Sequence, residues 1–105
     1  MKFTIDEFLA ELPKPANEKW IDGVWDVEPF AKNGVKLVFF APRGVDRQTF
    51  HDEDEYYFIA RGSGEIVIDG VHFACEAGVA LFVPARAEHH FENFSDDFAT
   101  WAVFF

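Results

Sequence analysis

Residues 66–73 of the chain read IVIDGVHF, and this short stretch decides the class of fold. Two apolar runs meet there across Asp69 and Gly70, and an Asp-Gly pair between such runs is a strong signal for a two-residue β-hairpin. Period-two alternation recurs at residues 35–39 and 56–59, and Gly or Pro separates the runs. Many short strands with this punctuation indicate an antiparallel sandwich or barrel.

The N-terminal segment follows a different pattern. Thr4 and Glu7 have the spacing of a helical capping box, and the apolar residues at 5, 8, 9 and 12 recur with the period of a helix. Pro13 ends that helix. We therefore predict an all-β protein with one domain over residues 1–105, a short helix over about residues 4–12 and a barrel over about residues 20–105.

Composition narrows the classes of partner. The chain has 105 residues, with 19 acidic against 9 basic residues and a net charge of −10. Because nucleic-acid binding depends on clustered Lys and Arg, we expect no nucleic-acid partner. The N-terminus is acidic within seven residues, and no apolar run reaches the length of a membrane span, so we expect a cytoplasmic protein without a signal peptide or membrane segment.

Histidine and glutamate carry the chemistry. His51 and Glu55 flank the acidic turn at residues 52–54, so they would face each other across a tight hairpin, and His89 follows Pro84 later in the chain. Two imidazoles and a carboxylate that converge on one cation form a ligand set suited to Fe, Mn, Ni or Zn.

The spacing of these residues resembles the two sequence motifs of the cupin family over roughly residues 44–94. The first motif appears as Thr49-Phe50-His51, three residues, Glu55, six residues and Gly62. The second appears as Gly78, five residues, Pro84-Ala85-Arg86, two residues, His89, three residues and Asn93. The resemblance implies a double-stranded β-helix, or jelly-roll barrel, with one divalent metal ion held by His51, Glu55 and His89.

Strand alternation supports that ligand set. If Glu55 faces inward, so do Tyr57 and Ile59, and if His89 faces inward, so do Phe91 and Asn93, whereas His90 faces outward.

Two departures from the motifs bear on the site. Thr49 occupies the place of the first motif histidine, and we expect it to be a weak ligand or to bind a metal-held water. Arg86 occupies the place of a glycine, and its planar fork could orient an acidic substrate. Tyr57, Phe91 and Trp101 are further candidates for contact with the substrate.

Three functions stay open at this point. One is a metal-dependent enzyme, such as a dioxygenase or isomerase, that acts on a small organic substrate. The second is a non-catalytic module that binds a small ligand in a barrel whose metal site is degenerate or empty. The third is a structural domain that binds no ligand. We also predict a homodimer, because Tyr56, Phe58 and Phe40 have the parity of exposed aromatic residues.

Overall fold

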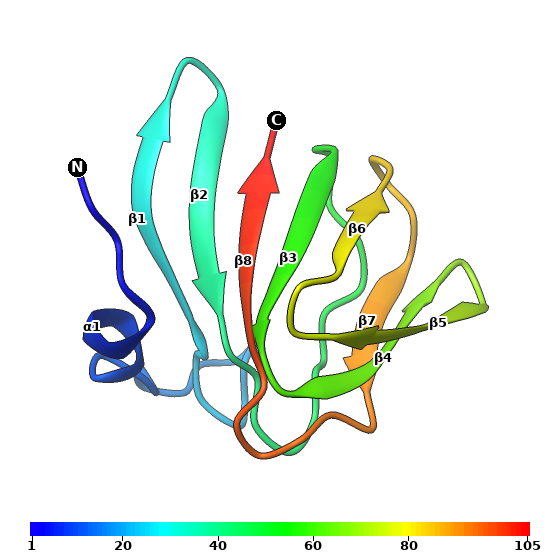
Figure 1. Cartoon of the computed structure of the whole chain (residues 1–105), viewed down its shortest axis with the longest axis horizontal. Coiled ribbons are helices and arrows are strands. Elements are labelled where there is room, and N and C mark those ends of the chain that lie inside the picture. The colour runs from blue at the N-terminus through cyan, green and yellow to red at the C-terminus, as the bar shows by residue number, and fades with distance from the viewer.

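The computed structural model describes residues 1–105 and contains two antiparallel sheets that face each other (Figure 1). The larger sheet has the strand order β1-β2-β8-β3-β6, and the smaller one has the order β5-β4-β7. The predicted antiparallel β-barrel with one short helix is confirmed. The strands are β1 (Asp26–Lys32), β2 (Val35–Phe40), β3 (Glu55–Arg61), β4 (Ser63–Ile68), β5 (Val71–Glu76), β6 (Ala80–Val83), β7 (His89–Glu92) and β8 (Ala99–Phe104).

The predicted hairpin joins β4 to β5. Asp69 and Gly70 have positive φ angles of 47° and 80°, and Ile68 pairs with Val71 across the turn. Positive φ at both central residues is the turn geometry that matches the twist of the flanking strands. Within β5 only Cys75 is buried.

The helix α1 (Ile5–Leu9) is shorter than predicted, because the chain after Leu9 continues in turns. Its capping box is present: the Thr4 amide donates to Glu7 Oε1 at 2.9 Å, and the Glu7 amide donates to Thr4 Oγ1 at 3.4 Å. No helix in the structure has the length and apolarity that crossing a membrane requires.

The buried residues form two clusters, one on each side of the larger sheet. The cluster between the sheets fills the barrel and includes Tyr57, Ile66, Phe91 and Phe98. The second cluster lies on the outer face of the larger sheet, where α1 packs Phe8 against the sheet. The helix therefore covers one part of that outer face and takes no part in the barrel interior.

Gly62, the last residue of the first motif, fills a position that admits no side chain. Its φ is +77°, and a Cβ atom would lie 2.3 Å from Ser95 Oγ and 3.0 Å from the Phe98 Cα atom. We predict that Gly62→Ala lowers the free energy of unfolding by about 2–4 kcal/mol, from backbone strain and from overlap. Denaturant unfolding measures this loss.

Gly34→Ala is the matched control. Gly34 has a similar φ of +81°, and no atom lies within 4 Å of the place that a Cβ atom would take. This substitution therefore carries the backbone strain alone and is expected to lower the free energy of unfolding by about 1–2 kcal/mol. Equal losses for the two variants would show that close packing at Gly62 contributes nothing.

Candidate functional site

The candidate site lies at the N-terminal end of β3. Glu55 is the first residue of this strand, and strand alternation turns it inward with Tyr57, as predicted. His51 precedes the acidic turn, and its Nε2 atom lies 2.9 Å from Glu55 Oε1. The side chain of Glu55 is 1% exposed, so this carboxylate is held almost entirely out of water.

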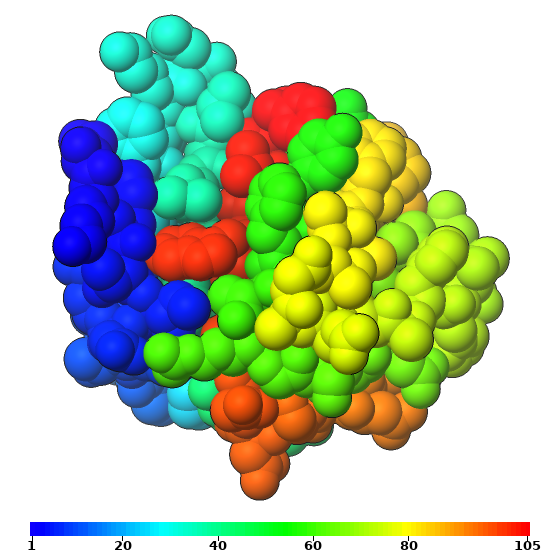
Figure 2. Space-filling model, in the orientation of Figure 1, coloured from blue at the N-terminus to red at the C-terminus, as the bar shows by residue number.

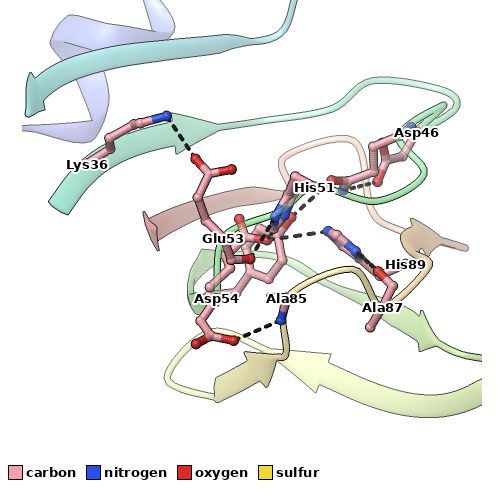
Figure 3. A network of polar contacts seen from close by, with 11 residues as sticks. Lys36, Asp46, His51, Glu53, Asp54, Ala85, Ala87 and His89 are labelled. Atoms are coloured by element: carbon pink, nitrogen blue, oxygen red, sulfur yellow. Dashed lines mark hydrogen bonds and ion pairs between the residues drawn. The ribbon is translucent and has the colours of Figure 1, made fainter. Parts of the chain in front are cut away.

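His89, the first residue of β7, brings the second imidazole to the same carboxylate oxygen. Its Nε2 atom lies 3.3 Å from Glu55 Oε1, and the centroids of the two imidazole rings are 4.8 Å apart. Figure 3 shows the side chains of His51 and His89 directed toward one place between the strands. The backbone ties the elements together, since the His89 amide donates to the Thr49 carbonyl at 2.7 Å and the Arg86 amide donates to the His51 carbonyl at 2.7 Å.

Backbone carbonyls determine which ring nitrogen of each imidazole carries a hydrogen. His51 Nδ1 lies 3.0 Å from the Glu53 carbonyl oxygen, and His89 Nδ1 lies 2.9 Å from the Ala87 carbonyl oxygen. A carbonyl can only accept, so each Nδ1 carries a hydrogen and donates it. In neutral imidazoles both Nε2 atoms then present lone pairs to Glu55 Oε1, which is itself an acceptor.

Three acceptor atoms therefore converge with no hydrogen atom between them. Glu55 Oε2 and His89 Nε2 are moreover buried without a hydrogen-bond partner. Burial acts to lower the pKa of His89, but Glu55 and the Ala87 carbonyl together raise it above its usual value. The site therefore attracts positive charge, which either a proton or a metal ion can supply.

The distances also suit a metal ion. The candidate ligand atoms of His51, Glu55 and His89 lie within 4.8 Å of one another. A tetrahedral ion with bonds of 2.0–2.1 Å separates neighbouring ligand atoms by about 3.3 Å, close to the observed 2.9 and 3.3 Å. Two imidazoles and one carboxylate with open positions are also the facial ligand set of non-haem iron enzymes.

A pocket of about 160 Å³ adjoins His51 and Glu55. Seven of the 12 residues that line it are hydrophobic, and Tyr57 is the only hydroxyl-bearing one. The tyrosine hydroxyl donates to Gln48 Oε1 at 3.2 Å, and Gln48 Nε2 donates to Asp46 Oδ2 at 2.6 Å. Burial raises the pKa of Tyr57 well above its usual value and also raises the pKa of Asp46. Tyr57 is therefore a neutral hydrogen-bonding group at pH 7.

Two predicted contributors, one from each motif, do not enter the site. The side chain of Thr49 is exposed, and its backbone carbonyl instead holds the His89 amide. Arg86 lies outside the pocket, where its fork binds Asp52 at 2.7 Å and its guanidinium stacks 5.5 Å from the ring of Phe50. Phe50 lines the pocket, so Arg86 packs against a residue of the pocket wall without lining the pocket itself.

The structure places Trp101, a predicted contact of the substrate, away from the pocket. Trp101 pairs with Phe58 across β3 and β8, so it shares the outward parity of Phe58. It packs against Phe8 beneath α1, with ring centroids 5.9 Å apart. Phe91 does face inward, but it lies in the barrel core between Tyr57 and Phe98 rather than on the wall of the pocket.

Several pocket residues were not predicted from the sequence. Lys19, Trp20 and Gln48 line the pocket, although they come from segments without periodic pattern. The one local signal is Asn17, whose Oδ1 accepts the amides of Lys19 and Trp20 and thereby forms the turn that presents both residues.

Comparisons with known proteins agree with the fold. A sequence model of the family described as Cupin domain matches residues 36–105. The chain is 44% identical over 50 residues to dimethylsulfoniopropionate lyase DddW of Ruegeria pomeroyi, and this match covers 48% of this chain and 33% of the lyase. It is 32% identical over 56 residues to the HTH-type transcriptional activator RhaS of Mannheimia succiniciproducens, over 53% of this chain and 21% of the activator.

The match thus spans about a third of the lyase and a fifth of the activator. Among solved structures, a cupin 2 conserved barrel domain protein from Salinispora arenicola superposes with a TM-score of 0.65 at 22% identity, over 76% of this chain and 73% of that protein. The lyase DddQ of Ruegeria pomeroyi superposes with a TM-score of 0.63 at 23% identity, over 72% of this chain and 40% of that protein. At these identities the structural likeness concerns the fold.

Proposed function

Because the chain belongs to the cupin family, we propose that His51, Glu55 and His89 hold one divalent metal ion in a small enzyme that acts on a small organic substrate. One observation carries the proposal: the Nε2 lone pairs of two imidazoles are directed to Glu55 Oε1. The other carboxylate oxygen, Glu55 Oε2, is buried beside them without a hydrogen-bond partner. Bound there, the metal supplies Lewis-acid chemistry at an open coordination position.

The residues around this centre suit a reaction that moves a proton. The pocket offers a small substrate a partly apolar wall, and Tyr57 offers it a neutral phenolic oxygen whose hydrogen is directed to Gln48. Because a curated relative is a lyase, we favour an elimination or isomerisation over other reactions of this fold. Oxygen chemistry is the second candidate, favoured by the ligand set of two histidines and one carboxylate.

Metal analysis tests the centre directly. We expect the full chain, purified without added metal, to carry one equivalent of a divalent transition metal by mass spectrometry. Chelation should remove it, and Fe²⁺, Mn²⁺, Ni²⁺ or Zn²⁺ should restore it. A chain that keeps no metal at these residues after each ion is added would favour the non-catalytic ligand-binding module instead.

We further propose that the chain acts as a homodimer in the cytoplasm. On the outer face of the larger sheet, α1 covers one side, while side chains of β3 and β6 lie uncovered at the surface (Figure 2). Four aromatic residues there are each 42–48% exposed, and the rings of three of them neighbour that of Tyr56: Phe58, Phe82 and Phe105. A contiguous aromatic patch of this kind is typical of a protein interface. Phe40 does not belong to it, because it faces the barrel and contacts Phe91.

For this patch we predict that sedimentation finds a dimer of 12.0 kDa chains, and that Phe58→Asp converts it to a monomer. A charge placed within an apolar interface must lose its hydration on association. Val71→Asp, at an exposed apolar residue of the other sheet, is the control and should stay dimeric. A wild-type chain that sediments as a monomer at micromolar concentration would contradict the dimer.

A further inference from the structure

We propose a second divalent-metal site, of the zinc type, on the outer face of the smaller sheet, with Glu65, His72 and Glu92 as its ligands. These residues come from β4, β5 and β7, three neighbouring strands. His72 Nδ1 lies 3.1 Å from Glu65 Oε2 and 3.4 Å from Glu92 Oε1. These separations again match the roughly 3.3 Å between neighbouring ligand atoms of a tetrahedral zinc ion.

The two carboxylates are oriented before any ion arrives. The second oxygen of each one is held by another residue: Asn93 Nδ2 donates to Glu65 Oε1 at 3.2 Å, and His90 Nε2 lies 3.1 Å from Glu92 Oε2. This arrangement leaves Glu65 Oε2 and Glu92 Oε1 facing the imidazole of His72. Outer partners of this kind fix the ligands of known metal sites and raise their affinity.

The two carboxylates on this face favour the binding of a cation. Glu65 and Glu92 are directly opposite each other across β4 and β7, where two like charges are destabilising. Neither forms an ion pair with Lys or Arg, and their only basic partners are His72 and His90. Lys and Arg therefore supply no compensating positive charge to these two carboxylates. A divalent ion bound between them supplies that charge.

The site is separate from the inner centre. His89 and Phe91 point into the barrel from β7, whereas Glu92 alternates to the opposite face of that strand. The side chains of Glu65, His72 and Glu92 are 36–56% exposed, so an ion can reach them directly from solvent. The inference therefore does not depend on what His51, Glu55 and His89 bind.

Equilibrium dialysis of the full chain against Zn²⁺, with metal analysis of both sides, tests the proposal. We expect the wild type to bind one equivalent more than His72→Ala, whatever the inner centre holds. Glu92→Gln should weaken this equivalent at least about tenfold, as the loss of a ligand or its support does in other sites. Glu88→Gln removes a nearby exposed acid that forms no ion pair in this structure, and it should bind as the wild type does.

A second measurement guards against a folding defect. Without zinc, His72→Ala and Glu88→Gln should show wild-type thermal unfolding because their side chains are exposed, and Glu92→Gln should unfold no earlier because it removes a like charge opposite Glu65. In NMR spectra, Zn²⁺ should shift the ring signals of His72 in the wild type. Three results would each overturn the proposal. The first is equal zinc uptake by the wild type and His72→Ala, and the second is a loss of zinc affinity in Glu88→Gln as large as that in Glu92→Gln. The third is that the His72 signals do not move at saturating zinc.

Discussion

Glu55→Gln is expected to lower the affinity of the chain for a divalent metal by at least about 100-fold, more than the loss of an outer partner costs. The substitution keeps the shape of the side chain but removes the only anionic ligand of the proposed centre. The amide also places a donor or a weaker oxygen where Oε1 and Oε2 now lie. Competition with a chromophoric chelator measures the affinity.

Glu53→Gln is the matched control. The side chain of Glu53 binds Lys36 Nζ at 2.8 Å, away from the pocket, while its backbone carbonyl holds His51 (Figure 3). Because the substitution leaves that carbonyl in place, metal affinity should change by less than a few-fold. Similar losses in both variants would mean that the ligand has been assigned two residues away from its true place.

Phe91→Ala is expected to lower the free energy of unfolding by about 3–5 kcal/mol, the range for removing a fully buried phenylalanine. Phe91 is 1% exposed and lies edge-on to Tyr57 and Phe98, with ring centroids 4.8 and 5.0 Å apart. The cavity left behind cannot collapse easily, because β7 is held in place by pairing with β4. Denaturant unfolding of the metal-free chain at fixed concentration isolates this loss from effects of metal binding or association.

Phe73→Ala serves as the control for lost aromatic area. Phe73 lies on the edge strand β5 and is 44% exposed, so its removal should cost less than about 1 kcal/mol. An unchanged unfolding midpoint for Phe91→Ala would contradict the assignment of Phe91 to the core.

Strand alternation made much of the fold and the inward ligands predictable. Glu55, Tyr57 and Ile59 are buried while Tyr56 and Phe58 are exposed, as the alternation requires. The same rule failed for Asn93, which is exposed. Its φ is +52°, so the backbone leaves the strand conformation after Glu92 and alternation no longer applies.

Arg86 shows a different limit. Its φ is +68°, in the left-handed region that glycine adopts without strain. The glycine of the motif thus marks a backbone conformation, and this chain keeps that conformation with an arginine. The sequence could show the substitution, but it could not show that the side chain would turn outward to Asp52.

The pocket wall was the least predictable part. Trp101 and Trp20 are equally aromatic, yet only Trp20 lines the pocket. The difference depends on the register of β8 against β3 and on the path of an irregular segment, and neither leaves a local pattern in the sequence. For the same reason Gln48 was not predicted as a pocket residue, whereas its neighbour Thr49 was singled out because it lies in the motif.

The single buried side chain of β5 has a consequence for local motion. Cys75 is 4% exposed, on an edge strand that pairs only with β4, and burial raises the pKa of its thiol. A thiol reagent can therefore reach the sulfur only when the hairpin of β4 and β5 opens, so its reaction rate reports that opening. An ion bound by Glu65, His72 and Glu92 would link β5 to β4 and β7 and slow this reaction, so the rate at which Cys75 is modified also reports whether the ion is bound.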